Sequence, residues 1–574
     1  MRRSLDGDSG RADDPARERA SAPRAGSDRA SVLIPALLVL LLFAVGVPSL
    51  SRYSVTWDEA LGDFFFGERY LSFFTSFDAK YLAFEGDPYP ADRSPDLSGS
   101  PFRIKPWEYY PIANGLAAAT SALLARRLRL LDPFDALHAV NLFLGAALLI
   151  SMFAFARRRF GRGAALAAVL FLFLSPRIVC DLMANTKDFP EMVFFSLTVL
   201  ALFEALERGS VRGVIGAGAL WGLALGTKAN ALFLPAIPLL ALALGGVPAA
   251  WRGRGRALVL ALAGAAALGV AILIASWPYV WADPIGRLGQ HLRYIALQKF
   301  QTRAESVAPP LQAILFTTPI PFLALFLVGL LPVAERARKR DAAAILPLAW
   351  LAVVLGRLFL PGAVNFDGVR HFLEVFPPMA IVAGCGLAWG AERVTVAARS
   401  TATARAALLA AAFALPLGSQ AASLARAHPF EIAYWNALAG GLAGARARAM
   451  PQAGDYWGAS YRTGIRWLNE HAPQGTILAV PIVEHAVRLV APLWLRPDIR
   501  LAALTTPIRP DVDPNRMTRL REVAREQPVY VMFVWREDWT NALIDECRAR
   551  LTPEVEWRLG GAPVLSIYRY TPPS

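Results

Sequence analysis

The feature that most constrains the fold of this 574-residue chain is a series of long apolar runs separated by short basic loops. A helix rises about 1.5 Å per residue, so a run of about 20 apolar residues crosses the hydrocarbon core of a bilayer. The pattern predicts a mostly helical, polytopic membrane protein. We expect about eleven transmembrane helices, near residues 31–50, 134–155, 163–182, 189–206, 213–227, 229–246, 257–276, 311–332, 342–360, 372–390 and 406–424.

The composition agrees with a membrane protein. Apolar residues make up 55% of the chain and charged residues 18%, whereas soluble domains have roughly 45–50% and about 25%. The net charge of +14 is carried by short clusters between apolar runs and not by one face, so membrane lipids are expected partners and nucleic acid is not. With 6 histidines, 3 cysteines and no ligand-like spacing, no metal and no other cofactor is indicated.

The basic clusters fall in every second short loop, for example at 157–162, 252–256 and 336–340. The positive-inside rule therefore predicts that these loops and the N-terminus are cytoplasmic. An odd number of spans places the segment after residue 426 on the opposite side. The chain is bacterial in style, so we expect a multi-pass protein of the cell inner membrane with a periplasmic C-terminal domain.

Three parts of the chain are predicted on this basis. Residues 1–30 are charged and rich in Ser, Gly and Arg, which is typical of a disordered cytoplasmic tail. Residues 31–426 form the transmembrane domain, in which 51–133 is a long outer loop with interfacial helices. Residues 427–574 are expected to form a small soluble α/β domain. Its helical segment and three β-branched runs are Arg462–His471, Thr476–Val480, Val529–Val534 and Val564–Tyr568.

Two adjacent carboxylates, Asp58 and Glu59, follow the first predicted span beside Trp57. Desolvation next to the membrane would raise their basicity, and a carboxylate in such a place can accept a proton from a hydroxyl nucleophile. The alternative is that the acidic residues only solvate the start of a loop helix. An Asp-Glu pair by itself leaves both interpretations open.

Several motifs, in order along residues 31–470, resemble glycosyltransferase family 39, the protein O-mannosyltransferase and aminoarabinose-transferase group with the membrane-embedded GT-C fold. The motifs are Trp57–Asp58–Glu59, Tyr109–Tyr110–Pro111–Ile112, Asn185–Pro190, Trp277–Pro278–Tyr279, Trp281–Pro284, Asp367–Phe372, His428–Glu431, Tyr434–Asn436 and Gly440–Gly441. The resemblance implies that 31–426 is a GT-C catalytic domain. It also implies inverting transfer of a hexose or pentose from a polyprenyl phosphate donor on the outer face of the membrane. The acceptor is left open as a protein, lipid A or another glycan.

By motif match, Asp58 is expected to act as the base, and Glu59 to hold the loop or orient Asp58. A leaving lipid phosphate needs cations but no proton. The cations expected to bind the donor phosphate are Lys187, Lys228, Arg370, His371 and Lys105, the last in place of a basic residue or proline that family members carry before Pro111.

Each of these cations also has a structural interpretation. Lys228 could snorkel to the interface, Lys187 could form an ion pair with Asp188, and Arg370 with His371 could anchor the loop to lipid headgroups. The residues assigned to the acceptor entrance or its loop are Asp188, Asp283, Trp281 and Tyr110, although interfacial aromatic residues explain the tryptophan equally well.

A secondary transporter or lipid-linked sugar flippase is the alternative function, because charged residues at membrane depth also mark substrate pathways. Transporters commonly contain internal repeats and short outer loops. This chain has no evident repeat, and the outer loop after its first span is about eighty residues long. Both features favour an enzyme.

Overall fold

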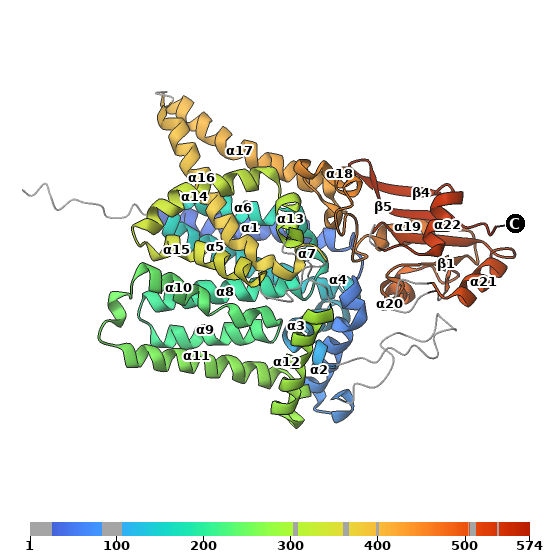
Figure 1. Ribbon diagram of the computed structural model, residues 1–574, viewed down its shortest axis with the longest axis horizontal. Helices are drawn as coiled ribbons and strands as arrows, with labels where there is room; N and C mark the ends of the chain where they lie inside the picture. Colours follow the sequence, from blue (N-terminus) through green and yellow to red (C-terminus); the bar gives the residue numbers. More distant parts are fainter. Residues whose placement is uncertain are drawn as a thin grey trace, which may run out of the picture.

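The computed structural model describes residues 26–82, 106–301, 308–359, 367–397, 401–502, 504, 512–536 and 539–573. These residues form a bundle of helices with a small sheet-containing domain at one end (Figure 1). The mostly helical architecture with a small C-terminal sheet confirms the predicted fold class. The predicted disordered tail, 1–30, falls largely outside the described residues.

Within the described residues, seven helices are long and apolar enough to cross a membrane. Two further helices are bent by 64° at Ser175–Pro176 and would form an eighth span together. Three shorter apolar helices complete the bundle, so the expected count of about eleven spans is not confirmed. The seven candidate spans are Val32–Leu50 in α1 (Gly26–Leu50), Pro133–Phe160 in α4 (Pro133–His138) and α5 (Val140–Phe160), α8 (Asp188–Glu207), α11 (Gly255–Ser276), α14 (Ile320–Arg338), Arg370–Val396 in η9 (Arg370–Val375) and α16 (Phe376–Ala397), and α17 (Ala402–Ala427); the bent pair is α6 (Arg162–Phe173) and α7 (Pro176–Ala184), and the shorter helices are α9 (Val211–Leu225), α10 (Ala236–Gly245) and α15 (Ala342–Arg357).

Helices α8 and α16 form the centre of the bundle. Within their most apolar stretches 83% and 89% of the residues are buried, against 17% in α11 and 6% in α17. Glycines allow the closest crossings: a Cβ on Gly329 of α14 would lie 1.9 Å from the carbonyl oxygen of Val382 in α16, so only a residue without a side chain fits. The central helices are thus covered by others, and their ends are fixed in position.

The basic loops predicted for one side of the membrane meet at one end of the bundle. Arg158 and Arg208 both pair with Glu204, and Nη1 of Arg336 donates to the carbonyl of Arg159 (3.0 Å). The opposite end carries the short helices that follow α1 and α11, and the C-terminal domain (Figure 1). These short helices are η1 (Glu59–Asp63), α2 (Phe64–Ser76), α3 (Pro111–Ser121), η5 (Ala122–Arg127) and α12 (Pro284–Gln301).

The C-terminal domain is built on a five-stranded sheet of order β2-β1-β3-β5-β4. Strand β1 pairs in parallel with β2 and β3, and β5 pairs antiparallel with β3 and β4. All three predicted runs form strands, and the predicted helix is α19. The elements are α19 (Tyr461–His471), β1 (Ile477–Ala479), α20 (Glu484–Trp494), β2 (Arg500–Ala502), α21 (Pro514–Val523), β3 (Val529–Val534), α22 (Ala542–Arg550), β4 (Val555–Leu559) and β5 (Ala562–Arg569).

The segment after α1 is held between the bundle and the C-terminal domain. Backbone hydrogen bonds run from Ser54 N to the oxygen of Ala459 (2.8 Å) and from Trp57 N to the oxygen of Trp457 (2.9 Å). Arg462 of α19 forms a buried ion pair with Asp135 of α4. Apolar residues of both parts share one core. The loop that carries the predicted base is therefore fixed from two sides.

Candidate active site

Glu59 connects the loop after α1 to the loop before α8. Its Oε2 accepts hydrogen bonds from the backbone N and the hydroxyl of Thr56 (both 2.9 Å), and its Oε1 accepts from the corresponding atoms of Thr186 (both 3.1 Å). Nε2 of His138 lies 3.1 Å from Oε2. With both oxygens used and 1% of the residue exposed, Glu59 is suited to hold the loop and not to exchange protons with a substrate.

Asp58, one residue earlier, faces two cations. Its Oδ2 accepts from Lys187 Nζ (2.9 Å) and from Arg370 Nη1 (3.1 Å), and 20% of its side chain stays exposed. Burial acts to raise the pKa of Asp58, but Lys187 and Arg370 outweigh it and hold the pKa below its ordinary value. Asp58 is therefore an ionised and partly accessible carboxylate at neutral pH, as an acceptor of a proton must be.

Asp188, at the start of α8, forms the second centre of negative charge. It is fully buried; its Oδ1 accepts from Lys228 Nζ (2.5 Å) and its Oδ2 from Arg370 Nη1 (3.2 Å). Lys228 also lies 3.4 Å from Nδ1 of His371. The structure thus brings together four of the five residues predicted to bind the donor phosphate, Lys187, Lys228, Arg370 and His371. Lys228 pairs with Asp188, and the ion pair that the sequence suggested for Lys187 is made with Asp58 instead.

Arg370 is the central residue of this charge cluster. It contacts Asp58, Asp188 and Asp367, the last through Nη2 at 2.7 Å, and its guanidinium lies 4.6 Å from the ring centroid of Trp457. Asp367 was not predicted as a site residue, although its position three residues before Arg370 in one motif was a usable signal. A guanidinium shared by several carboxylates is well suited to exchange one of them for a phosphate.

Asp63 is a further carboxylate of the cluster that was not assigned from the sequence. It is buried, with Oδ2 3.4 Å from Lys187 Nζ and Oδ1 accepting from Asn114 Nδ2 (3.3 Å). Burial raises the pKa of Asp63 to about 7, although Lys187 opposes the shift. This residue can therefore bind or release a proton near neutral pH beside Asp58. No group of three or more His, Cys, Asp or Glu residues arranged for a metal occurs among the described residues.

The C-terminal domain contributes side chains to the rim of the cluster. Arg536 Nη2 lies 3.2 Å from Oδ1 of Asp367, and Nε2 of His485 lies 3.1 Å from the carbonyl oxygen of Trp57. Burial lowers the pKa of His485 to about 4, so the neutral ring donates this hydrogen bond. No sequence motif pointed to Arg536 or His485, because each lies more than a hundred residues from its partner in the cluster, Asp367 for Arg536 and Trp57 for His485.

Four other predicted residues lie away from the cluster or outside the described residues. Tyr110 is buried, and its hydroxyl lies 2.9 Å from His291 Nε2. Its carbonyl oxygen accepts a hydrogen bond from Asn114 Nδ2 (2.9 Å). Asp283 accepts from Gly286 N (2.9 Å) at the start of α12, and Trp281 donates to the oxygen of Ile274 (2.7 Å). Asp283 and Trp281 make no contact with Asp58, Lys187 or Arg370. Lys105 falls outside the described residues.

The chain resembles known proteins in part of its sequence and in its fold. A sequence model of the family described as dolichyl-phosphate-mannose-protein mannosyltransferase matches residues 127–277. The crystal structure of ArnT from Cupriavidus metallidurans bound to undecaprenyl phosphate superposes with a TM-score of 0.51 at 14% identity, covering 93% of this chain and 97% of ArnT. The oligosaccharyltransferase AglB from Archaeoglobus fulgidus gives a TM-score of 0.41 at 12% identity, covering 89% of this chain and 70% of AglB. No curated protein sequence matches the chain.

The chain thus has the GT-C fold, which confirms the resemblance stated from its motifs. The class of protein that fold and family match define is a multi-pass membrane glycosyltransferase. The matched segment, 127–277, includes Lys187, Asp188 and Lys228 of the charge cluster.

Proposed function

We propose that the protein transfers a sugar from a polyprenyl phosphate donor to an acceptor hydroxyl on the non-cytoplasmic side of the membrane. The observation that carries this proposal is the position of Asp58: a partly exposed carboxylate in a cluster of buried cations at the end of the bundle opposite the arginine-rich loops. ArnT, which shares the fold over almost its full length, was crystallised with undecaprenyl phosphate.

In the proposed reaction Asp58 removes the proton of the acceptor hydroxyl as its oxygen attacks C1 of the donor sugar. The bond between C1 and the phosphate oxygen breaks from the opposite face, so the configuration at C1 inverts. The electron pair of that bond goes to the phosphate, and the cations of Lys228 and Arg370 stabilise the charge. Lys228 pairs with Asp188, and Arg370 contacts both Asp188 and Asp58, so Arg370 links the proposed base to the proposed phosphate site.

Glu59 and Lys187 have supporting roles in this proposal. Glu59 fixes the distance between the loops of Thr56 and Thr186, and Lys187 keeps Asp58 ionised until the hydroxyl arrives. Asp63, which titrates near neutral pH, is placed to receive the proton from Asp58 through Lys187. The acceptor is a hydroxyl of a protein, lipid A or another glycan.

The first test is sugar transfer in membranes that contain the protein and a radiolabelled undecaprenyl phosphate sugar. We expect labelled product with the wild-type protein and a decrease of about 100- to 10,000-fold with Asp58→Asn, since a positioned base contributes about 10²–10⁴-fold to the rate. Asp283→Asn, a carboxylate outside the charge cluster, is the control and should keep its activity. Wild-type turnover by Asp58→Asn would remove Asp58 from the mechanism, and movement of the lipid-linked sugar across the membrane without a new glycosidic bond would favour a flippase.

The proposed orientation places the C-terminal domain in the periplasm of a bacterial inner membrane, with the N-terminus in the cytoplasm. A tag at the C-terminus should be digested by protease added to intact spheroplasts. Protection of the tag, with digestion only after lysis, would reverse the orientation.

A further inference from the structure

One buried cation outside the charge cluster forms no salt bridge with a described residue. Arg177, at the start of α7, is 3% exposed. Its Nε donates to the carbonyl of Tyr434 (3.2 Å), but Nη1 has no hydrogen-bond partner. The nearest acid along the same helix, Asp181, accepts instead from Asn185 Nδ2 (2.7 Å).

An arginine in this position needs an explanation, because the guanidinium stays protonated in proteins and is costly to bury without an anion. The rings of Trp435 and Tyr456 lie 5.9 Å and 5.6 Å from the guanidinium carbon. Such contacts offset only part of the cost of desolvation. A bound water could satisfy Nη1 as a donor, but it would bring no negative charge, and the one acid that interacts with Arg177 along this helix, Asp181, already accepts from Asn185.

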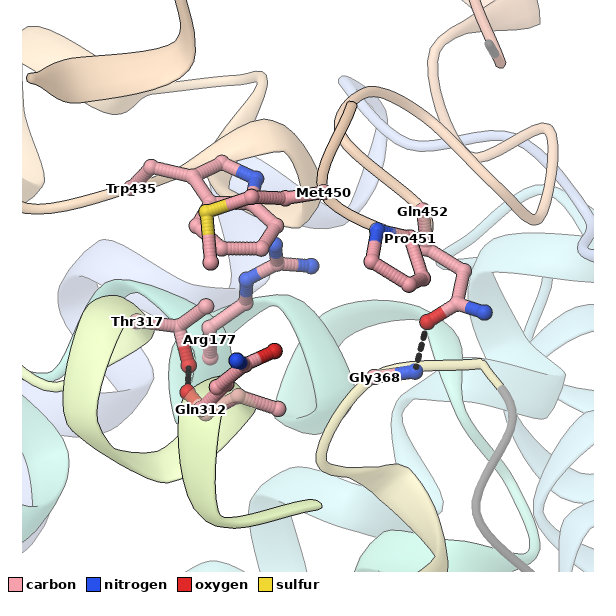
Figure 2. A pocket seen from close by; sticks show the side chains of 9 residues that line it. Arg177, Gln312, Thr317, Gly368, Trp435, Met450, Pro451 and Gln452 are labelled. Atoms are coloured by element: carbon pink, nitrogen blue, oxygen red, sulfur yellow. Dashed lines mark hydrogen bonds between the residues drawn. The ribbon is translucent and has the colours of Figure 1, made fainter. Parts of the chain in front are cut away.

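Arg177 lines a pocket that is rich in donors and has no carboxylate in its wall. Figure 2 shows the guanidinium between Trp435 and the amide of Gln312. Gln312 lines the pocket and is exposed at its rim. Gln452 uses its Oε1 to accept from Gly368 N (3.2 Å), which leaves its amide NH₂ available as a donor. The free volume inside is about 10 Å³, room for about one oxygen atom of a ligand whose remainder stays outside the rim.

The pocket is separated from the charge cluster by one short loop. Gly368 belongs to its wall, and the preceding residue, Asp367, pairs with Arg370, which in turn contacts Asp58. Tyr456 contacts both Gly368 and Arg177. The Tyr456 hydroxyl would lie 3.1 Å from a Cβ on Gly368, and the Tyr456 ring packs against the guanidinium of Arg177. A ligand anchored in the pocket would therefore lie beside the proposed base.

We propose that Arg177 and the surrounding pocket form an oxyanion subsite that binds a phosphate or carboxylate group of the acceptor. The donor phosphate is already assigned to Lys228 and Arg370 on the other side of the loop, so a second anion belongs to the second substrate. This inference rests on the proposed function, because only a transferase has an acceptor. Its physical basis, an unpaired buried guanidinium at a pocket, does not depend on turnover.

The first experiment measures anion binding without catalysis. Full-length protein in nanodiscs saturated with undecaprenyl phosphate, which occupies the donor site, is titrated with inorganic phosphate and separately with acetate at constant ionic strength, by calorimetry. The wild-type protein should bind at least one of the two anions, and Arg177→Gln should bind it about 10- to 100-fold more weakly, as expected for one charge-assisted hydrogen bond.

Two variants keep this experiment decisive. Arg448→Gln removes an exposed arginine of the neighbouring segment, whose Nη1 donates to the carbonyl of Leu438 (3.2 Å), and should bind phosphate like the wild type. Arg177→Lys retains the charge without the planar fork and should show an intermediate affinity, even where Arg177→Gln fails to fold. The subsite would be overturned if the wild-type protein bound neither anion. It would also be overturned if the wild type, Arg177→Lys and Arg177→Gln all bound the anion with equal affinity.

The second experiment assigns the anion to a substrate. In the sugar-transfer assay Arg177→Gln should raise the KM for the acceptor about 10-fold or more and change the KM for the lipid-linked donor less than about 2-fold. An equal or larger rise in donor KM would overturn the assignment to the acceptor and place a donor group in the pocket. Absence of sugar transfer by the wild-type protein would overturn the proposed function and this assignment, whereas the binding titration would still decide whether the oxyanion subsite exists.

Discussion

The two ends of the helical bundle both carry arginines, but in different surroundings. At the end formed by the basic loops, Arg158 and Arg208 share Glu204, whose side chain is only 11% exposed, but the two arginine side chains are 42% and 64% exposed. At the other end, Arg370 is 4% exposed and contacts three carboxylates. An arginine that water already solvates contributes little to stability through its ion pairs, whereas breaking the contacts of a buried arginine leaves charges without compensation.

This difference shows which charged residues determine topology and which determine chemistry. The exposed arginines could stand at other positions of the same loops without changing the orientation of the chain, since the positive-inside effect depends on their number and not on their contacts. Each buried residue of the charge cluster is fixed by named partners. The following predictions test this comparison, in order of decreasing expected effect.

Replacing Lys228 by alanine should have the largest effect among these variants. It removes the cation 2.5 Å from the buried Asp188 and should raise the KM for the lipid-linked donor about 100-fold, with a smaller effect on the acceptor, because a charge-assisted contact to the phosphate is lost. Donor and acceptor titrations of sugar transfer measure this. Lys339→Ala, which removes the exposed Lys339–Glu335 pair at the other end, is the matched control. Equal effects on both substrates would make Lys228 a structural lysine.

Replacing Arg536 by glutamine should reduce kcat about 10-fold and move the acidic limb of the pH–rate profile to higher pH. Without Arg536, Asp367 is neutralised only by Arg370, and Arg370 is drawn away from Asp58. The pKa of Asp58 then rises toward its ordinary value, so Asp58 becomes protonated at a higher pH. Arg536→Lys should restore most of the activity. A pH profile identical to that of the wild type would show that the C-terminal domain does not influence the base.

Asp63 should make the stability of the fold depend on pH. Its pKa is raised from 3.8 unfolded to about 7 folded, so its stabilising contribution is complete below about pH 4 and is lost as pH rises through about 7. Between pH 6 and pH 8 the wild-type protein should lose about 1 kcal/mol of stability relative to Asp63→Asn. The difference in Tm between the two proteins at both pH values measures it. A constant difference would mean that the carboxylate is ionised throughout.

Replacing Arg208 by glutamine should have the smallest effect. The Arg208 side chain is largely exposed, and the buried Glu204 keeps its pair with Arg158, so the stability change should stay within about 0.5 kcal/mol and sugar transfer should be unchanged. A thermal unfolding curve and the standard transfer assay suffice. A loss comparable to that of Lys228→Ala would erase the distinction between the two ends of the bundle.

Much of the candidate site could be predicted from the sequence because it lies within local motifs. Asp58 follows the first span, Asp188 starts α8 and Arg370 starts the span that contains α16, so each sits at a helix end that hydropathy locates. Asp283 and Trp281 belong to a similar motif, yet they cap and anchor α12 instead. Motif membership therefore indicates the right end of the bundle but not the right partner.

The partners themselves could not be predicted, since they come from segments far apart in the chain. Arg536 meets Asp367, and His485 meets the carbonyl of Trp57, across gaps of 169 and 428 residues. No periodicity or local motif encodes such pairs. The lack of a salt bridge between Arg177 and any described residue was equally invisible, because such an arginine is recognised only when the acids around it have been placed in space.

The sequence by itself determined that the chain crosses a membrane many times, that its basic loops and its acidic motifs alternate, and that its C-terminal part contains a small sheet. These properties follow from hydropathy and local periodicity, which act over about twenty residues. Only the tertiary structure decided that Glu59 holds the loop, that Arg370 is shared by three carboxylates, and that Arg177 faces a pocket. Electrostatic roles depend on distances in space and on exclusion of water, and folding alone sets both.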